Sequence, residues 1–279
     1  MDKGWAIKYF LTDLISYTAE QTPKPRNEIW ASDLGKPFID RYLQMKGEPY
    51  SNPSDGQGLF NFFLGKQLEK GVADMLKSCH IAHSAQEKIT IQAMPEKDYL
   101  PVVGKPDLIL EVKNWKDVLN NIDEAIEKLT DEDSRLKDKK TFLKGLVGNW
   151  QEKYPEGLRK TVFEIKSINS MAFRYHKNTG GLSNAYPHHK LQLYTYMNGL
   201  HLDEGHILYV AKDTGFIEEI VIQTSNQLDK EWRDDIKTIT KYFKANQMPP
   251  LEPLEIGGKG NWRAKYSRYY DLLYKKTNK

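Results

Sequence analysis

Residues 161–170 read TVFEIKSINS and place a carboxylate, Glu164, two positions before an ammonium group, Lys166. Side chains at positions i and i+2 of a β-strand point to the same face, so these two groups lie side by side. Phe163 and Ile165 then point to the opposite face. A carboxylate beside a lysine can hold a metal ion and orient or deprotonate a water molecule. An exposed ion pair would have the same sequence, so the pair alone does not identify an active site.

A second carboxylate stands at the start of another apolar segment, VVGKPDLILEV at residues 102–112. Gly104 permits a turn that presents Asp107 at the edge of a sheet. The alternative is that Asp107 is a turn residue that binds local backbone N–H groups. If the two segments are neighbouring strands, they supply two carboxylates and one lysine to one site. Such hard oxygen ligands suit Mg²⁺ or Mn²⁺, which keep several waters and accept phosphate oxygens.

Two predicted helices could add polar side chains to this site. Gln192 and Tyr196 are four residues apart and project from one helical face, with His188 one turn earlier. This face could hold a catalytic lysine in place and contact a nucleotide. The alternative is a half-buried helix whose tyrosine reaches water. In a helix over residues 57–78, Glu69 follows Gly65 by one turn and lies on or beside the buried stripe.

These segments resemble the PD-(D/E)XK nuclease superfamily. Pro106-Asp107 and Glu164-Ile165-Lys166 are similar to its signature, and GKPD, FEIKS and HHKLQLYTY resemble the G-x-x-D, E-x-K and Q-x-x-x-Y series of RecB-type exonuclease domains. ASDLGKPFIDRYLQMKGE is similar to the serine-leucine segment of the same group, which includes CRISPR-associated RecB-like nucleases. The resemblance extends from about Trp30 to Val210 in the expected order.

The resemblance implies metal-dependent hydrolysis of phosphodiester bonds, with one or two Mg²⁺ or Mn²⁺ ions as cofactor. It implies that Asp107, Glu164 and the backbone carbonyl of Ile165 bind the metal. Glu69 is the expected third ligand, at a position where RecB-type domains often have a histidine. Catalytic roles are implied for the following residues: Asp107, Glu164, Lys166, Gln192 and Tyr196.

The substrate that the resemblance implies is DNA, as single strands or duplex ends. Basic residues near the proposed site are candidates for contacts with its phosphates. The candidates are Lys36, Arg41, Arg174, His176, Lys177 and His188. Each of them could equally be an ordinary solvated surface charge. The net charge of the 279-residue chain is only +3, so nucleic-acid binding requires a local cluster of basic residues.

Several classes of site are excluded by the sequence. Cys79 is the only cysteine, so no intramolecular disulfide and no iron-sulfur cluster of the kind found in some relatives can form. None of the Gly-Lys steps is followed by Ser or Thr, so we expect no ATP site, and any unwinding would need a helicase or recombination partner. The N-terminus is amphipathic and charged, which predicts neither a secretion signal nor a membrane span. We therefore expect a cytoplasmic protein with no membrane partner.

The expected architecture is an α/β (α+β) fold with a restriction-endonuclease-like core, in which helices flank a central mixed β-sheet. We predict a single nuclease domain over residues 1–279, with helical parts at residues 1–56 and 226–279. Residues 113–160 are highly charged but keep apolar residues at helical spacing, which predicts an inserted helical hairpin. Its charges indicate a solvated face or, alternatively, an arm that contacts DNA or a partner.

The function predicted from these observations is that of a metal-dependent DNA nuclease, with exonuclease activity favoured over endonuclease activity. DNA processing, repair and recombination are the expected settings. Two alternatives stay open, namely a catalytically silent nucleic-acid-binding or scaffold protein with this fold, and a nuclease that acts on RNA. Strand preference, polarity and oligomeric state are not predicted by the sequence.

Overall fold

The computed structural model describes residues 22–79, 81–83, 88–91, 97–127, 134–171, 185–256, 259–260 and 262–275. Residues 1–21 of the predicted helical part at residues 1–56 lie outside the described residues. The chain forms two compact units, each assembled from separate stretches of sequence. The first unit comprises Met1–Lys66, Thr90–Val103 and Ser225–Lys279, and the second comprises Gln67–Ile89 and Gly104–Thr224.

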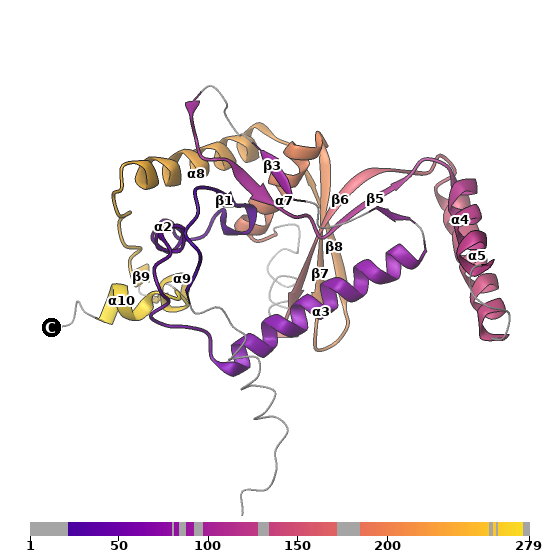
Figure 1. Cartoon of the computed structure of the whole chain (residues 1–279), viewed down its shortest axis with the longest axis horizontal. Coiled ribbons are helices and arrows are strands. Elements are labelled where there is room, and N and C mark those ends of the chain that lie inside the picture. Colours follow the sequence, from indigo (N-terminus) through magenta and orange to yellow (C-terminus); the bar gives the residue numbers. More distant parts are fainter. Residues whose placement is uncertain are drawn as a thin grey trace, which may run out of the picture. The chain divides into compact units, whose positions relative to one another are not determined.

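The second unit is built on a five-stranded mixed sheet (Figure 1). Its strand order is β2-β5-β6-β7-β8, and only the β6–β7 pair is parallel. The strands are β2 (Ala82–His83), β5 (Leu108–Val112), β6 (Leu158–Ile168), β7 (Glu204–Ala211) and β8 (Ile217–Gln223). Val162, Ile165 and Ile207 are fully buried, so both faces of the central strands are covered.

Helix α7 (Pro187–Leu200) makes the crossover that a parallel β6–β7 pair requires. Pro187 occupies the first helical turn, where no backbone N–H is needed, and the helix ends at His201 in the left-handed conformation. Where α7 packs on β7, a Cβ atom at Gly205 would lie 2.9 Å from the Met197 side chain. A glycine at this point therefore allows the helix to approach the sheet closely.

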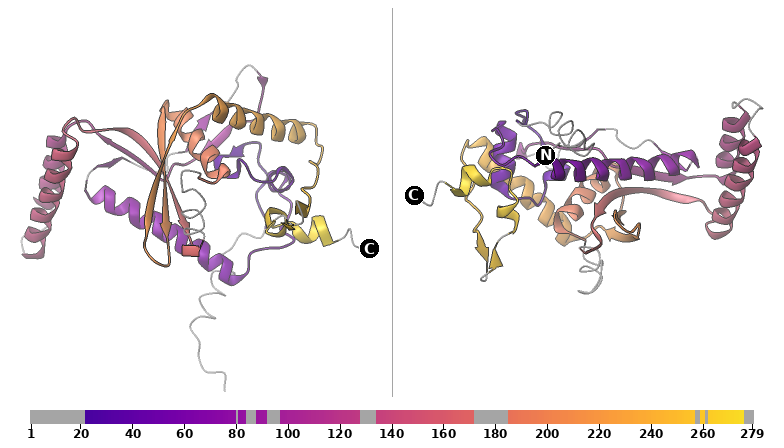
Figure 2. Two further views of the ribbon diagram at one scale, coloured as in Figure 1. Left: turned by 180° about the vertical axis from the view of Figure 1, so that it is seen from behind. Right: turned by 90° about the horizontal axis from the view of Figure 1, so that it is seen from below.

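The predicted inserted hairpin is present between β5 and β6. It consists of α4 (Trp115–Glu127) and α5 (Ser134–Lys153), which pack against each other at the far end of the β5–β6 ribbon (Figures 1 and 2). The indole nitrogen of Trp115 donates to the Tyr154 carbonyl at 2.7 Å and ties the start of α4 to the end of α5. The chain returns to β6 through Gly157, where φ is +88° and a Cβ atom would clash with the Val112 carbonyl.

A separate hydrophobic core holds the hairpin to the rest of the second unit. The apolar stripe of α4 supplies Val118 and Ile122, and α5 supplies Leu143 and Val147. Other buried members are Cys79, Ile81, Val112 and Trp115. The apolar spacing in residues 113–160 therefore forms a local core, as the sequence predicts.

The first unit contains a small sheet of order β1-β4-β3, in which β1 and β4 are parallel. These strands are β1 (Ile29–Trp30), β3 (Ile89–Ile91) and β4 (Val102–Gly104). Its other elements are η1 (Ala31–Asp33), α2 (Phe38–Lys46), α8 (Asn226–Lys244), β9 (Glu255–Ile256), β10 (Lys259–Gly260), α9 (Trp262–Lys265) and α10 (Tyr270–Tyr274). Helix α8 is capped by Ser225, whose hydroxyl accepts from the Leu228 N–H at 3.1 Å, and it packs against α2.

The start of α2 differs from the sequence-based prediction. From the sequence, Ser32 and Asp33 are residue types that predict an N-cap for this helix, but they lie in the short 3₁₀ turn η1, and α2 begins only after Pro37. Gly35 has a φ of +72°, which no right-handed helix contains, and the residue before a proline is disfavoured in helical conformation. The helix ends before Gly47, as predicted.

Helix α3 (Gly56–Ser78) has the predicted bounds. Of the large apolar residues at helical spacing that predict its buried stripe, Leu68, Val72 and Leu76 are half-buried, whereas Phe63 is 45%, Leu64 41% and Met75 63% exposed. Gly65 and Ala73 are buried instead, so the covered face is centred on small residues that allow close packing. Glu69 lies on this face and is half-buried. The predicted α/β class, with helices around a mixed sheet, is confirmed. In the described residues, no helix is long and apolar enough to cross a membrane.

Candidate active site

The antiparallel pairing of β5 with β6 brings the two predicted carboxylates together. Leu108 is the register partner of Phe163, so the residues just before β5 face the centre of β6. Asp107 Oδ2 accepts a hydrogen bond from the Ile165 N–H at 2.8 Å. Asp107 and Glu164 therefore lie at one place on the sheet, although the inserted hairpin separates them in sequence.

Glu164 and Lys166 form a direct ion pair on the face of β6 that they share. Glu164 is only 1% exposed, and Lys166 Nζ contacts its Oε1 atom. The other oxygen, Oε2, is buried and has no hydrogen-bond partner among the described residues. A buried carboxylate oxygen without a donor is costly, so this atom favours binding of a cation or a proton.

The electrostatics of the cluster follow from its burial. Burial raises the pKa of the Glu164 carboxyl to about 8, against the opposing effect of Lys166 and with a further contribution from the charge of Asp107. Burial also raises the pKa of Asp107. Burial alone would lower the pKa of Lys166, but the charges of Glu164 and Asp107 outweigh this effect, so the pKa of Lys166 is raised. Lys166 is therefore an ammonium group at neutral pH.

Glu69 on α3 belongs to the same electrostatic cluster. Its charge contributes to the raised pKa of Glu164 and to the raised pKa of Lys166, so its carboxylate lies within range of both groups. The one-turn spacing from Gly65 places Glu69 on the covered face of α3, as the sequence predicts. The structure thus brings Asp107, Glu164 and Lys166 together within the second unit, with Glu69 near enough to act on the pKa values of Glu164 and Lys166.

Helix α7 contributes the predicted glutamine-tyrosine pair. Gln192 Nε2 donates to Tyr196 Oη at 3.1 Å, and the two side chains are 7% and 2% exposed. Burial and the charge of Glu164 raise the pKa of Tyr196, while hydrogen bonds from Gln192 and from the backbone of Lys105 lower it. Tyr196 does not reach water. It lies in the interior, near Glu164 and the loop that carries Asp107.

A tyrosine that the sequence analysis missed lies beside Lys166. Tyr209 on β7 is the register partner of Lys166, and only 1% of its surface is exposed. Its hydroxyl accepts from the Tyr186 N–H at 3.3 Å and lies 2.7 Å from His189 Nδ1. Because the hydroxyl already accepts from the backbone, its proton is available to His189. Tyr209 therefore fixes the first turn of α7 next to the ammonium group.

Comparison with known proteins shows similarity in structure only. A scan of protein-family models gave no match, and neither did a search of curated proteins. The crystal structure of SSO0001 has a TM-score of 0.51 and 16% sequence identity, over 96% of each chain. An alkaline exonuclease, LHK-Exo from Laribacter hongkongensis, has 12% identity over 79% of this chain and 89% of that chain. Its TM-scores are 0.44 in complex with dAMP and 0.42 for a second structure. The likeness to SSO0001 shows a shared fold.

The carboxylate cluster can be tested for its fit to a divalent cation. In the part of the chain that the structure describes, no three His, Cys, Asp or Glu side chains are grouped so that they could hold a metal ion. Mg²⁺ and Mn²⁺ do not require such a cage, because one or two carboxylates suffice when waters and phosphate oxygens complete the shell. Asp107 and Glu164, with the unpartnered Oε2 atom of Glu164, fit this kind of site.

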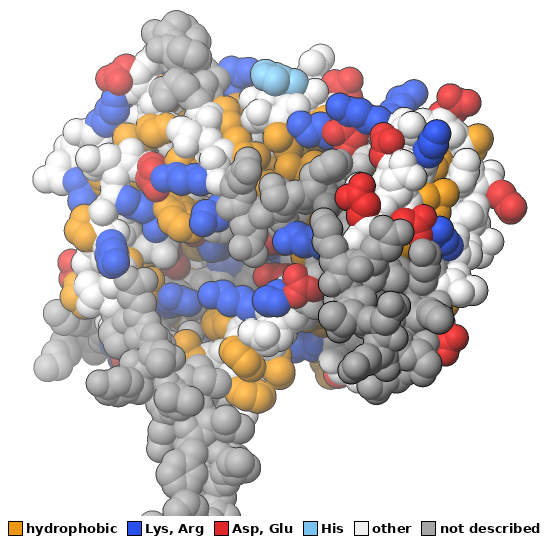
Figure 3. All heavy atoms as spheres, turned by 45° about the vertical axis from the view of Figure 1, so that its right-hand side comes forward, with side chains coloured by type: hydrophobic (Ala, Val, Ile, Leu, Met, Phe, Trp, Pro, Cys, Tyr) orange, Lys and Arg blue, Asp and Glu red, His pale blue; other side chains and the backbone are white. Residues whose placement is uncertain are grey.

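The predicted phosphate-binding residues have different environments. His188 is half-buried, and its ring lies 4.2 Å from the His189 ring in the first turn of α7. Lys36 Nζ lies 3.1 Å from Asp33 Oδ1 in the first unit, with 46% of its side chain exposed. Arg174, His176 and Lys177 lie outside the described residues. On the face in Figure 3, Lys and Arg side chains lie among acidic and hydrophobic ones.

Arg41 requires a correction. Its side chain is 1% exposed, and its guanidinium group binds both carboxylate oxygens of Asp235, at 2.5 and 3.0 Å. A buried, bidentate pair of this kind joins α2 to α8 and is not available to a phosphate. The prediction that Arg41 contacts DNA is therefore wrong for this structure. Sequence reasoning failed here because the partner of Arg41 lies 194 residues away.

Proposed function

We propose that this protein is a metal-dependent nuclease that hydrolyses phosphodiester bonds in DNA, with exonuclease activity favoured over endonuclease activity. The observation that carries this proposal is the cluster of Asp107, just before β5, with Glu164 and Lys166 on β6, in which Glu164 is buried and the other two are half-buried. Buried groups with strongly shifted pKa values concentrate at functional sites. A purely structural role would favour satisfied polar atoms, whereas Glu164 Oε2 has no partner among the described residues.

Asp107 and Glu164 would hold the ion, assisted by Glu69 and by the backbone carbonyl of Ile165. Within a strand, the N–H and C=O groups of one residue point toward the same neighbouring strand. The N–H of Ile165 points to Asp107, so its carbonyl is directed to the same side. A bound Mg²⁺ or Mn²⁺ supplies Lewis-acid activation of the scissile phosphate and lowers the pKa of a bound water.

Lys166 supplies positive charge at the reacting phosphate. Because neighbouring carboxylates hold its pKa above the ordinary value, Lys166 Nζ keeps its proton at neutral pH. It therefore donates a hydrogen bond to the attacking water or to a phosphate oxygen and stabilises the negative charge that develops there. This role needs no proton transfer to Lys166, unlike the general-base role that the sequence also allowed.

Residues on α7 and β7 position this lysine and can contact the substrate. Gln192 and Tyr196 form a buried pair beside Glu164. This pair limits the motion of the Glu164 side chain, to which Lys166 is paired. Tyr209 lies against Lys166 on the adjacent strand. His188 is half-buried in the first turn of α7, where a helix N-terminus favours anions such as phosphate.

The proposal is tested by incubating the purified protein with matched DNA and RNA strands, offered as linear molecules labelled at the 5′ or 3′ end and as circles labelled internally. Each substrate is offered with Mg²⁺, with Mn²⁺ and with EDTA. We expect loss of linear DNA with either metal and none with EDTA. Lys166→Ala should lower the rate about 10²-fold or more. Lys116→Ala, which changes an exposed lysine on the hairpin, is the matched control and should leave the rate unchanged.

The outcomes separate the proposal from its alternatives. Binding without cleavage under every metal would identify a catalytically silent protein and overturn the enzyme proposal. Faster cleavage of RNA than of DNA would identify RNA as the preferred substrate. Cleavage of circular DNA at the same rate as linear DNA would establish endonuclease activity. The release pattern from 5′ and 3′ labels gives the polarity.

A further inference from the structure

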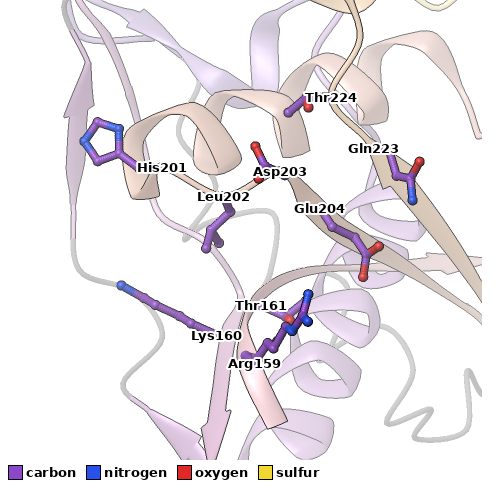
Figure 4. Close-up of a pocket in the computed structure, with 9 residues that line it drawn as sticks. All are labelled: Arg159, Lys160, Thr161, His201, Leu202, Asp203, Glu204, Gln223 and Thr224. Carbon is purple, nitrogen blue, oxygen red and sulfur yellow. The ribbon is translucent and has the colours of Figure 1, made fainter.

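A polar pocket with a volume of about 390 Å³ lies in the second unit, at one end of the central strands (Figure 4). One wall is the start of β6, with Arg159, Lys160 and Thr161, and the facing wall is the turn between α7 and β7. That turn contributes Leu202 and the two carboxylates of the dipeptide at residues 203–204. A hydrogen bond of 2.9 Å from the Thr224 N–H to the Asp203 carbonyl ties the turn to the end of β8.

This pocket is distinct from the candidate active site. Lys160 lies four residues before Glu164 on β6, which at about 3.3 Å per residue is a separation of ~13 Å along the strand. The residues that line the pocket do not include Glu69, Asp107, Lys166 or any other member of the carboxylate cluster. The pocket therefore needs an explanation of its own.

The β6 wall carries two cations that no acid neutralises within the described residues. Arg159 and Lys160 are both exposed, and neither forms an ion pair with a side chain that the structure describes. In Figure 4, Arg159 lies below Leu202 and Glu204, while the Lys160 side chain extends away from Arg159, toward the side on which His201 lies. Arg159 therefore offers its guanidinium group to a phosphate in the pocket, and Lys160 adds positive charge at the pocket edge.

The opposite wall of the pocket carries negative charge. Asp203 and Glu204 present carboxylates, and one of them is partly engaged, since Glu204 Oε1 lies 3.3 Å from His206 Nε2. A small inorganic anion would meet repulsion from this wall. A ligand with a phosphate at one end and N–H or O–H donors at the other would satisfy both walls, and Leu202 offers it an apolar contact.

We propose that this pocket binds one nucleotide unit, with its phosphate on Arg159 in the positive field of Lys160 and its sugar or base donors on Asp203 and Glu204. A nucleotide has this combination of groups, and the cavity lies at the small end of the range for small-molecule sites. The choice of ligand rests on the proposed function, because a nuclease meets nucleotides as substrate and as product.

The nucleotide can come from two sources with the same chemistry. The first is the bound substrate strand, since ~13 Å along β6 is within reach of a strand held at the candidate active site. The pocket would then anchor the strand at a fixed distance from the scissile bond. The second source is a released mononucleotide, which would occupy the pocket as product.

The test uses the full chain with Arg159→Gln and Lys160→Gln combined, which removes both charges and keeps side-chain length. A matched control, Arg159→Lys with Lys160→Arg, keeps both charges. Equilibrium dialysis with thymidine 5′-monophosphate in EDTA measures binding of the mononucleotide. Fluorescence anisotropy with a labelled 12-nucleotide strand, also in EDTA, measures binding of a strand. With metal present, KM is then compared for 4- and 12-nucleotide substrates.

We expect the glutamine variant to bind at least one of the two probes about tenfold more weakly, while the charge-keeping variant binds like the wild type. Loss of thymidine monophosphate binding with both KM values unchanged assigns the pocket to product. A raised KM for the 12-nucleotide substrate alone assigns it to the strand. Wild-type behaviour of the glutamine variant with both probes and both substrates would overturn the inference.

This design keeps the inference separate from the proposed function. Binding in EDTA does not require cleavage, so a protein that cuts nothing can still show the pocket. Conversely, wild-type binding of both probes together with unchanged cleavage in the glutamine variant leaves the nuclease proposal intact and removes only the pocket. Unaltered circular dichroism and thermal midpoints of both variants show that the exposed substitutions leave the fold in place.

Discussion

Asp107 Oδ2 accepts a hydrogen bond from the Ile165 N–H at 2.8 Å, across 58 residues of sequence. The bond continues the β5–β6 ladder by one step, with an acidic side chain in the place of a backbone carbonyl. Asp107 is thereby oriented by the backbone of the strand that carries Glu164 and Lys166. At the base of the hairpin the β5–β6 register shifts by one residue between Leu110 and Val112, so the irregularity lies at the end of β5 away from Asp107.

Two substitutions at Asp107 separate its orientation from its charge. Asp107→Asn keeps an oxygen that accepts from Ile165, so we expect near-normal stability and a cleavage rate reduced about 10²-fold or more. Asp107→Ala leaves the Ile165 N–H without an acceptor and should lower the free energy of unfolding by about 1–3 kcal/mol as well. Urea denaturation and cleavage of labelled DNA measure the two effects. Equal stability of both variants would contradict the positional role of the hydrogen bond.

Glu164→Gln should stabilise the metal-free protein while it abolishes cleavage. In the folded state burial raises the pKa of Glu164 to about 8, above its ordinary value of 4.5. A carboxyl of this kind is neutral in both states at low pH, and its burial opposes folding increasingly as the pH rises from 4.5 toward 8. The gain in stability of Glu164→Gln over the wild type should therefore grow over this pH range. It should reach only about 1–2 kcal/mol, because the amide also loses the ion pair with Lys166.

The measurement is the thermal midpoint in EDTA between pH 5 and pH 8, repeated with Mg²⁺. Wild-type protein should gain stability from Mg²⁺, because a ligand that binds only the folded state raises its stability. Glu164→Gln should gain little stability from Mg²⁺. A variant that is less stable than the wild type in EDTA at pH 8 would show that Glu164 contributes more through its ion pair than its burial costs.

Tyr209→Phe should loosen the first turn of α7 and lower activity without loss of the metal response. The hydroxyl of Tyr209 contacts the Tyr186 N–H and His189 Nδ1, and phenylalanine keeps the ring beside Lys166 but removes both bonds. We expect a loss of about 1–2 kcal/mol in stability and less than a tenfold fall in kcat. A double-mutant cycle with His189→Ala should give a coupling energy of about 1 kcal/mol. Additive effects would mean that the two side chains do not interact.

The elements with long periodic patterns were predictable from the sequence. The hairpin helices, α3 and α7 have bounds close to those expected, because apolar spacing over ten or more residues defines a helix. The alternation in residues 161–168 placed Glu164 and Lys166 on one face. Two-residue strands such as β1 and β9 carry no period and could not be found in this way.

Features that depend on pairing between distant segments were not predictable. Tyr209 lies next to Lys166 only because β6 and β7 are parallel and in one particular register. The buried face of α3 was predicted only in part, because Phe63, Leu64 and Met75 are exposed and small residues such as Gly65 pack inward. The role of Arg41 was misassigned because a positive charge in a sequence does not reveal a buried acidic partner.

Arg41→Met should destabilise the fold and leave DNA binding by the folded protein unchanged. It removes the partner of Asp235, whose side chain is only 10% exposed, and an uncompensated buried charge costs about 3–5 kcal/mol. Lys36→Met is the matched control and should cost less than about 1 kcal/mol, because the ion pair of Lys36 with Asp33 is half-exposed. Urea denaturation gives the stabilities, and anisotropy with labelled DNA gives the affinity. Weaker binding at unchanged stability would restore the phosphate-contact prediction for Arg41.

Asp40 in the first unit predicts a pH dependence of stability that is independent of the candidate active site. Burial raises the pKa of Asp40 from 3.8 to about 6, and the hydrogen bond that its Oδ1 accepts from the Ser267 hydroxyl at 2.7 Å only partly opposes this. Below pH 3.8 the carboxyl is neutral in both the folded and the unfolded state. Between pH 3.8 and 6 the unfolded state releases its proton first, so this residue increasingly favours unfolding.

Asp40→Asn removes the titration and keeps an oxygen that accepts from Ser267. The variant and the wild type should therefore be similar in stability near pH 4, and the variant should be more stable by about 1–3 kcal/mol at pH 7. Denaturant midpoints at several pH values measure this difference. A difference that stays constant from pH 4 to pH 7 would show that Asp40 does not titrate abnormally. Ser267→Ala should act in the opposite direction above pH 6, because it removes the one neutral donor that stabilises the ionised Asp40 carboxylate.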